Sequence, residues 1–348
     1  MIGGVGAKTY CDNSCTFFEY LMNETGQKAY YVLSKHSKDL EKVRKLGPVL
    51  YKDSIKANYF SLSAKALVFS SGLKGDIVRI NEKYLSRAVK VNLQHGVFGL
   101  KNNTIKYEAD FSVTCGEEEA KLKAPLLGKG QELILTGFPQ HDKLITESIK
   151  ITPDKKTIFY MPTWREWFVG KDSFKESDFY ANFTSFLTNP RLLAFLRENG
   201  IKINCYLHRN NMKYYSDLPD DLFNENICLL PENTNIQQQI LISSLLITDY
   251  SSVSWEFLLL KKGVIFYQFD QSEYLKQRGS LLDFDKGIFG PICKSADECI
   301  DLLMESTESG YDKLLDLSWR DKFFTHYDGK NCERIYKKIL IELARCKK

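Results

Sequence analysis

The chain has 348 residues, of which 43% are hydrophobic and 26% charged, a composition typical of globular proteins. This excludes a long disordered chain, a collagen-like protein and a coiled coil, and the length predicts two domains of about 150 residues each. Lys and Arg number 48 against 44 Asp and Glu, a formal net charge of +4. So weak a surplus does not indicate nucleic acid as a partner; it suits a phosphate-bearing substrate or an anionic membrane surface.

The hydrophobic runs are too short for a membrane-spanning helix, which needs about 18–20 apolar residues. The longest candidate, residues 240–247, is consistent with a buried helix end followed by a strand. The first residues lack the apolar stretch of a secretory signal. The nine cysteines contain no CxxC pair. We therefore expect reduced thiols in a cytoplasmic protein, and leave open a peripheral attachment to the inner face of the membrane.

In the first half of the chain, short β-rich runs alternate with helical patterns. The expected strands are residues 29–34, 66–71, 89–94, 111–116 and 132–138. The expected helices are residues 14–24, 38–46, 82–88, 117–123 and 141–148. Near-continuous apolar strands joined by helices predict a parallel sheet that is covered on both faces.

The second half repeats this alternation after a polar stretch, residues 151–156. The expected strands are residues 157–164, 202–208, 227–231, 244–250 and 263–269. The expected helices are residues 178–199, 234–243, 252–261, 296–305 and 329–345. The fold class is therefore α/β, with two doubly wound, Rossmann-like domains facing a central cleft. We expect the domains over 1–152 and 153–328, followed by a C-terminal helix over 329–348.

In doubly wound sheets, ligands bind at the carboxyl ends of the strands. One such end carries the run Thr248-Asp249-Tyr250-Ser251-Ser252, directly before an expected helix. Free backbone N–H groups and hydroxyls at a helix start form an anion site. The alternative is that Ser251 or Ser252 only caps the helix.

Two of the five histidines end expected strands in opposite halves of the chain, His95 and His208. A histidine with an ordinary pKa near 6.5 is suited to act as a general base on a hydroxyl, and Gly96 lets the backbone pass close to a ligand. His208, followed by Arg209, has the chemistry to contact a phosphate. The alternative for each is a hydrogen-bonded core histidine.

The strand over 157–164 leads into Pro162-Thr163-Trp164-Arg165. Arg165 has the fork geometry for a bidentate phosphate contact. Asp249 and Asp270 hold a ribose, orient a partner or cap a helix; the sequence does not rank these roles. No metal-ligand cluster and no DxD pair at a strand end occur, so we expect neither a metal nor a cofactor. The basic residues within 35–45 form either a solvated face or a contact with a membrane or polyanion.

Six motifs in order carry a family resemblance. They are LQHGVFGLK (93–101), TGFPQHDKL (136–144), FYMPTWRE (159–166), CYLHRN (205–210), LLITDYSSVSWEF (245–257) and VIFYQFDQSEY (264–274). Together they resemble the CDP-glycerol glycerophosphotransferase family, the teichoic acid polymerases and primases and related bacterial capsule polymerases. The resemblance runs from about Tyr10 to about Gly290.

The resemblance implies a GT-B arrangement with an acceptor-side N-terminal domain and a donor-binding C-terminal domain. It implies transfer of glycerol phosphate from CDP-glycerol to a hydroxyl of a teichoic acid-like or capsular polymer, with release of CMP. The roles it implies are a general base for His95, donor-phosphate contacts for His208 and Arg165, a phosphate cradle for Thr248, Ser251 and Ser252, and places in the donor cleft for Gly96, Pro162, Thr163, Asp249 and Asp270. Gln94 replaces the tryptophan and Arg209 the proline that many members carry.

Three other functions stay open. The first is the same chemistry with CDP-ribitol as donor, since the motifs recognise CDP and phosphates rather than the polyol. The second is a GT-B glycosyltransferase or epimerase that uses a UDP-sugar. The third is a non-catalytic envelope protein that binds a polyanion through the basic residues within 35–45. The acceptor is either a polyol phosphate or a glycan, and nucleic acid is not expected.

Overall fold

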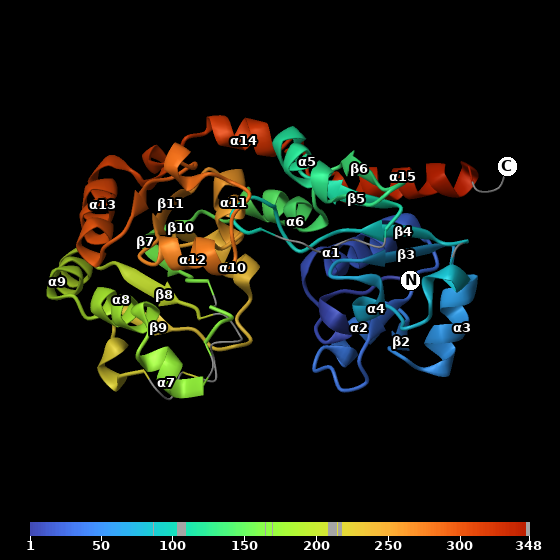
Figure 1. The fold of residues 1–348 in the computed structure, drawn as a ribbon, viewed down its shortest axis with the longest axis horizontal. Coiled ribbons are helices and arrows are strands. Elements are labelled where there is room, and N and C mark those ends of the chain that lie inside the picture. Colours follow the sequence, from blue (N-terminus) through green and yellow to red (C-terminus); the bar gives the residue numbers. More distant parts are fainter. Residues whose placement is uncertain are drawn as a thin grey trace. The chain divides into compact units, whose positions relative to one another are not determined.

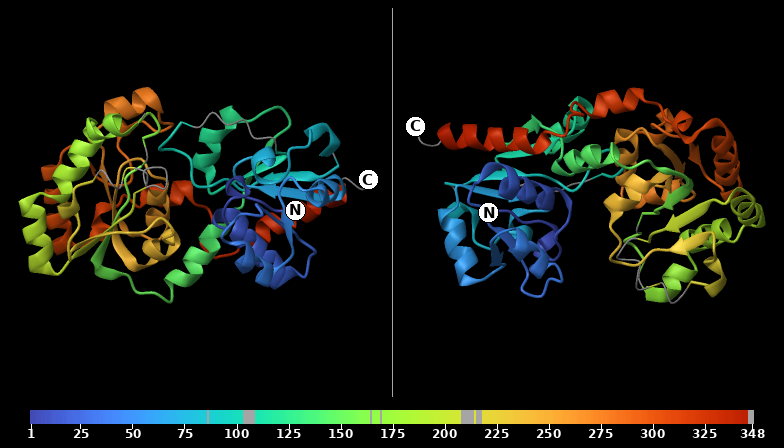
Figure 2. Two further views of the ribbon diagram at one scale, coloured as in Figure 1. Left: turned by 90° about the horizontal axis from the view of Figure 1, so that it is seen from below. Right: turned by 180° about the vertical axis from the view of Figure 1, so that it is seen from behind.

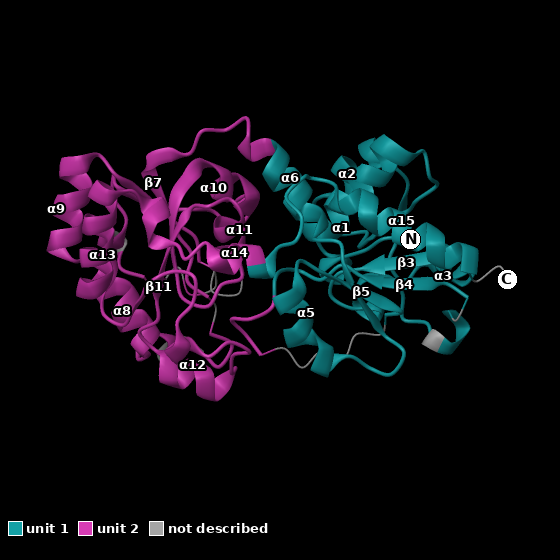
Figure 3. Ribbon diagram, turned by 90° about the horizontal axis from the view of Figure 1, so that it is seen from above, with its two compact units in different colours: residues 1–97, 104–146, 322–348 teal, residues 98–103, 147–321 magenta. Residues whose placement is uncertain are grey.

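The computed structural model describes residues 1–85, 87–102, 109–163, 165–168, 170–207, 214 and 218–345. The chain forms two compact units (Figure 3). Unit 1 comprises 1–97, 104–146 and 322–348, and unit 2 comprises 98–103 and 147–321. The division at 146/147 lies six residues before the expected boundary, and the chain returns to unit 1 at residue 322.

Unit 1 contains a four-stranded parallel sheet in the order β3-β4-β5-β6 and a parallel pair, β1-β2. Ile2 bridges Tyr31 of β1 and Val68 of β3. The strands are β1 (Tyr31–Leu33), β2 (Val49–Tyr51), β3 (Ala66–Phe69), β4 (Val89–Asn92), β5 (Phe111–Thr114) and β6 (Glu132–Leu135). The buried strand residues are mostly apolar, as parallel strands covered by helices require.

The helices of unit 1 include one from the far end of the chain. They are α1 (Asp12–Tyr20), α2 (Leu40–Leu46), α3 (Ile55–Ser63), α4 (Leu73–Asp76), α5 (Glu117–Lys123), α6 (Pro139–Ser148, at the division) and α15 (Asn331–Arg345). α15 contacts α1 and β4 (Figure 2). The carboxylate of Asp142 accepts the N–H groups of Asn331 and Cys332, 2.8 and 2.7 Å away, and so caps the start of α15.

Unit 2, which contains the strands β7 to β11 labelled in Figure 1, has a six-stranded parallel sheet. The strand order is β12-β11-β10-β7-β8-β9. The strands are β7 (Asp154–Tyr160), β8 (Lys202–Cys205), β9 (Ile227–Leu229), β10 (Ser243–Thr248), β11 (Gly263–Tyr267) and β12 (Ile292–Cys293). The helices are α7 (Gly170–Lys175), α8 (Asp178–Leu187), α9 (Pro190–Asn199), α10 (Ile236–Ile242), α11 (Val253–Leu259), α12 (Gln271–Gln277), α13 (Ala296–Ser309) and, at the division, α14 (Ser318–Phe323).

The expected helix over 178–199 is wrong in one respect, because it is two helices. Pro190 has no N–H and stands at the first position of α9, while Asn189 caps α9 by accepting the N–H of Arg191. Both helices bury aromatic and leucine side chains in one core with β7, β8 and β10. Short helical turns lie at Val5–Ala7, Leu21–Thr25, Glu82–Leu85, Ala124–Leu126, Asp220–Leu222, Phe284–Lys286 and Tyr311–Leu314. None of the helices among the described residues is both long and apolar enough to cross a bilayer.

Candidate functional site

In unit 1, the segment after β4 turns sharply and presents His95. Gln94 adopts a left-handed conformation, with φ of 58°. Its N–H donates to the Asn92 side chain at 2.8 Å, and its carbonyl accepts from the Asn13 amide at 2.8 Å. These bonds fix the turn at the carboxyl end of β4, which is where a doubly wound sheet places its ligand-binding residues.

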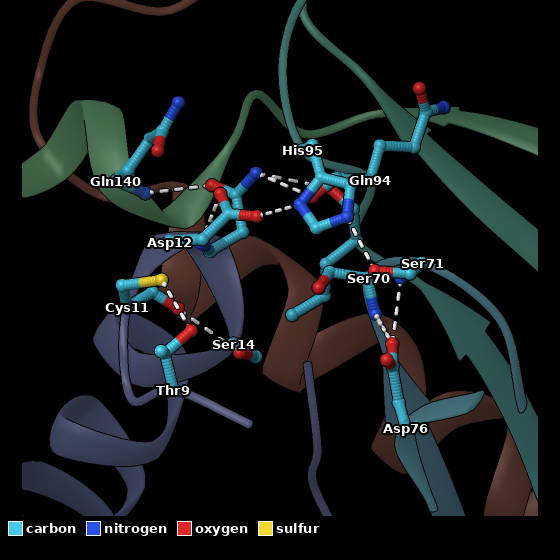
Figure 4. A network of polar contacts seen from close by, with 12 residues as sticks. Thr9, Cys11, Asp12, Ser14, Ser70, Ser71, Asp76, Gln94, His95 and Gln140 are labelled. Atoms are coloured by element: carbon cyan, nitrogen blue, oxygen red, sulfur yellow. Dashed lines mark hydrogen bonds and ion pairs between the residues drawn. The ribbon is translucent and has the colours of Figure 1, made fainter. Parts of the chain in front are cut away.

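The imidazole of His95 lies between a carboxylate and a hydroxyl (Figure 4). Nδ1 is hydrogen-bonded to Asp12 and Nε2 to the Ser71 hydroxyl. Asp12 opens α1 with φ of 70°, and Ser71 follows β3. A carboxylate on Nδ1 holds the proton there, so Nε2 is left as the basic nitrogen beside a hydroxyl.

The loop that carries Ser71 is held by one buried carboxylate. Asp76 accepts the N–H groups of Ser70, Ser71 and Gly72 at 2.9, 2.7 and 3.3 Å. It also accepts the N–H of Gly6 at 2.7 Å. Three of these four charge-assisted bonds come from the loop itself, so Asp76 fixes the backbone that carries Ser71.

The charges around His95 favour its protonated form. The side chain of Asp12 is only 11% exposed, while that of His95 is 50% exposed. Partial burial opposes the imidazolium, but the attraction and hydrogen bond of Asp12, with a smaller effect of Asp76, outweigh it, and the pKa of His95 is raised. Burial raises the pKa of Asp12, which His95 partly offsets. Both shifts therefore favour the binding of a proton by the pair of His95 and Asp12.

Sequence reasoning found His95 but missed its two partners. Asp12 lies just outside the helix that we expected over 14–24, and Ser71 is the last residue of an expected strand. A serine after a buried strand is a signal of the same kind as His95 after β4. Nothing in the sequence indicates that Asp12 packs against a residue 83 positions away.

In unit 2, Arg165 is buried between two carboxylates. Its side chain is 0% exposed; Nε and Nη2 donate to Asp270 at 2.6 and 2.9 Å, and Nη2 also lies 2.8 Å from Asp249. Nη1 donates to the carbonyl of Thr163 at 2.6 Å. Burial opposes the charge, but the two carboxylates more than compensate, so the pKa of Arg165 is raised. This differs from the expected open fork, because the planar group is already occupied on its donor edges.

The same carboxylates organise the ends of β7 and β10. Asp249 accepts the N–H groups of Thr163 and Tyr250 at 2.8 and 2.6 Å. Tyr250 stacks on Tyr274 with ring centroids 3.5 Å apart, and its hydroxyl donates to Asp270 at 3.3 Å. Arg165, Asp249 and Asp270 thus form one support that joins the strand ends.

The hydroxyl side chains in the run Thr248-Asp249-Tyr250-Ser251-Ser252 differ in the hydrogen bonds that they make. The Thr248 hydroxyl is buried and donates to the carbonyl of Met161 at 2.6 Å, so it also departs from the expected phosphate contact. Ser251 receives a weak bond from the N–H of Val253 at 3.4 Å, and Ser252 stands at the cap position of α11 without a side-chain cap bond. Among these hydroxyls, those of Ser251 and Ser252 are the better placed to bind a ligand.

The other predicted site residues are placed as follows. Pro162 and Thr163 are buried after β7, and Gly96 is partly buried next to His95. His208, Arg209 and Trp164 lie outside the described residues. Within the described ranges, no group of three or more His, Cys, Asp or Glu side chains is arranged to hold a metal ion.

The sequence is similar to curated proteins of teichoic acid biosynthesis. It is 26% identical to the minor teichoic acid biosynthesis protein GgaB of Bacillus subtilis (strain 168), over 94% of this chain and 38% of that protein. It is 28% identical to the teichoic acid glycerol-phosphate transferase of Staphylococcus aureus (strain NCTC 8325 / PS 47), over 60% of this chain and 54% of that protein. The chain thus spans well under two thirds of the length of either relative.

The fold is shared with solved structures. The wall teichoic acid polymerase TagF matches with a TM-score of 0.70 and 20% identity, over 98% of this chain and 88% of that chain. A UDP-GlcNAc 2-epimerase from Neisseria meningitidis matches with a TM-score of 0.56 and 13% identity, over 97% and 98%. These likenesses confirm the predicted α/β fold of GT-B type. The family model described as CDP-glycerol:poly(glycerophosphate) glycerophosphotransferase matches residues 4–341, and the chain therefore belongs to this family.

Proposed function

We propose that this protein transfers glycerol phosphate from CDP-glycerol to a hydroxyl of a teichoic acid-like or capsular polymer and releases CMP. Family membership over residues 4–341 supports the reaction class. The observation that carries the proposal is the imidazole of His95, held by Asp12 on one side and in contact with a hydroxyl on the other. Transfer to a hydroxyl needs such a base.

In unit 1, His95 Nε2 takes the proton of the acceptor hydroxyl as its oxygen attacks the β-phosphorus of the donor. The bond from that phosphorus to the oxygen of CMP breaks, and CMP leaves with the electron pair. Asp12 keeps the proton of the neutral imidazole on Nδ1 and stabilises the imidazolium that forms. The Ser71 hydroxyl either marks the place beside Nε2 that the acceptor hydroxyl takes, or orients the acceptor hydroxyl there. No covalent intermediate is required.

Unit 2 binds the donor in this proposal. The hydroxyls of Ser251 and Ser252 and nearby N–H groups hold phosphate oxygens, with His208 as a further donor. Four residues support the site without contacting the donor, because their polar groups are already paired; they are Arg165, Asp249, Asp270 and Thr248. They fix the strand ends from which Thr163 and the serines project. We expect the backbone to approach the ligands closely at two positions, Gly96 and Pro162.

The direct test is release of CMP. The protein is incubated separately with CDP-glycerol and CDP-ribitol, each with a polyol-phosphate acceptor. We expect acceptor-dependent CMP from CDP-glycerol, with the higher kcat/KM for that donor. A higher kcat/KM for CDP-ribitol would instead assign the ribitol reaction, which four of the similar curated proteins are named for. Absence of CMP from both donors, in a folded sample, would refute the transferase.

The basic residues within 35–45 are the proposed contact with an anionic membrane. All six, Lys35, His36, Lys38, Lys42, Arg44 and Lys45, are exposed in the structure. Such a cluster near a surface attracts anionic lipids. We expect co-sedimentation with vesicles that contain phosphatidylglycerol, weaker at high salt, and a peripheral location on the inner face of the membrane. Equal binding to neutral vesicles would contradict the electrostatic contact.

A further inference from the structure

The segment 98–102 belongs to unit 2, although the chain on both sides of it belongs to unit 1. The carbonyl of Gly99 accepts the N–H groups of Leu281 and Leu282 at 3.0 and 3.1 Å, and the Ser280 hydroxyl at 3.0 Å. The N–H of Asn102 donates to the carbonyl of Gly279 at 3.1 Å. These bonds flank Lys101 on both sides, so unit 2 fixes the backbone that carries this lysine.

The attachment depends on close approach at Gly99. Its φ is +148°, and an added Cβ would lie 3.0 Å from side-chain atoms of both Leu282 and Trp255. A larger residue would therefore push the segment away from unit 2. Lys101 follows Gly99 by two residues, so this close packing also restricts where the backbone of Lys101 lies.

Lys101 is partly buried, and within the described part of the chain it has no hydrogen-bond or ion-pair partner. The charged groups near it are Asp249, Glu166, Arg165 and Arg278. Both carboxylates are already engaged: Asp249 by Arg165 and two N–H groups, and Glu166 by Arg278 at 2.8 Å. A partly desolvated ammonium without an acceptor is stabilised when an anion from outside the chain binds to it.

Burial of this ammonium has a measurable consequence. It lowers the pKa of Lys101 to about 8, with Arg278 and Arg165 acting in the same direction and Asp249 and Glu166 against it. The lysine therefore loses its charge as the pH rises through about 8, unless an anion binds. A phosphate anion would supply the missing opposite charge.

We propose that Lys101 is a phosphate ligand of unit 2 and pairs with the pyrophosphate of the CDP-activated donor. This proposal rests on the proposed function. It adds a cation to the donor site, and that cation comes from the segment that follows His95 in the sequence. In this proposal the lysine and the two serines belong to one phosphate site, because Asp249, whose charge acts on Lys101, stands two residues before Ser251. Arg165, which the sequence suggested for this role, is paired with carboxylates instead.

The test is CDP binding by calorimetry, with Lys101→Ala, Lys101→Arg and the control Lys276→Ala, whose lysine is exposed and pairs with Glu273. We expect Lys101→Ala to weaken CDP binding by about tenfold or more, and Lys276→Ala to bind as the unchanged protein does. Cytidine, which has no phosphate, should bind all variants alike. If Lys101→Ala fails to fold by circular dichroism, Lys101→Gln replaces it.

The pH dependence separates charge from structure. Because binding needs the ammonium, CDP affinity of the unchanged protein should fall as the pH rises through about 8 towards 9.5. Lys101→Arg keeps its charge, so its affinity should stay level over that range. Unchanged CDP affinity in folded Lys101→Ala, or the same pH decline in Lys101→Arg, would overturn the role of Lys101 alone. Failure of the unchanged, folded protein to bind CDP would overturn the proposed donor as well.

Discussion

Replacing Asp12 by Asn tests how the carboxylate acts on His95. The amide keeps the size of the side chain and tolerates the left-handed backbone at this position, where φ is 70°. It removes the negative charge that faces the imidazole. The fold should therefore survive while the support of the imidazolium is lost.

The magnitude follows from the contact. A hydrogen bond to a charged group is worth about 1.5–3 kcal/mol, which corresponds to roughly 10–150-fold in rate. Asp12 is 11% exposed, so water screens it little, but half of the His95 side chain is exposed. We therefore expect kcat to fall by about 10–30-fold, in the lower part of that range, with little change in KM for the donor.

The pH profile gives the second readout. Asp12 raises the pKa of His95, and a base must be neutral to accept a proton. The acid limb of kcat should therefore lie above pH 6.5 in the unchanged protein and move to lower pH in Asp12→Asn. A merely structural role for Asp12 would lower the rate without moving this limb.

The assay is CMP release over a pH series, and the matched control is Asp53→Asn. Asp53 also has positive φ, 62°, but its side chain is 43% exposed and pairs with Arg79 at 3.5 Å. This control should keep the rate and the pH profile. Full kcat with an unmoved acid limb in Asp12→Asn would refute the proposed coupling to His95.

Two further predictions concern stability. Arg165→Met leaves the carboxylates of Asp249 and Asp270 buried without their cation, so the free energy of unfolding in urea should fall by about 3–5 kcal/mol. The control Arg191→Met, at an exposed arginine, should leave that free energy nearly unchanged. Equal stability of the two variants would contradict the buried network. Asp142→Ala removes the acceptor of two N–H groups at the start of α15, so it should lower the free energy of unfolding by about 1–2 kcal/mol in the same assay; no loss would show that α15 does not depend on this cap.

Periodicity and turn residues predicted most of the fold, because strands buried on both faces are apolar throughout. Some elements escaped this reasoning. β2 has three residues, and α3 presents Ile55, Tyr59 and Leu62 to solvent, so neither carries a normal burial pattern. Pro190 was the missed signal that divides α8 from α9.

The sequence indicated candidate residues that follow the ends of strands, such as His95 and Ser251, because apolar runs show where the strands end. The site was not predictable where a role depends on packing between distant segments. The sequence shows that Arg165 can fork onto an anion, but not that the anions are Asp249 and Asp270. Nor does it show that Asp142 caps α15 from within α6.

The central claim is that His95 is the general base of the transfer. The most direct measurement is CMP release by His95→Ala with CDP-glycerol and a polyol-phosphate acceptor, together with its affinity for CDP. We predict that turnover falls by about 10²–10⁴-fold while CDP binds as tightly as before. Near-normal turnover in His95→Ala would contradict the account.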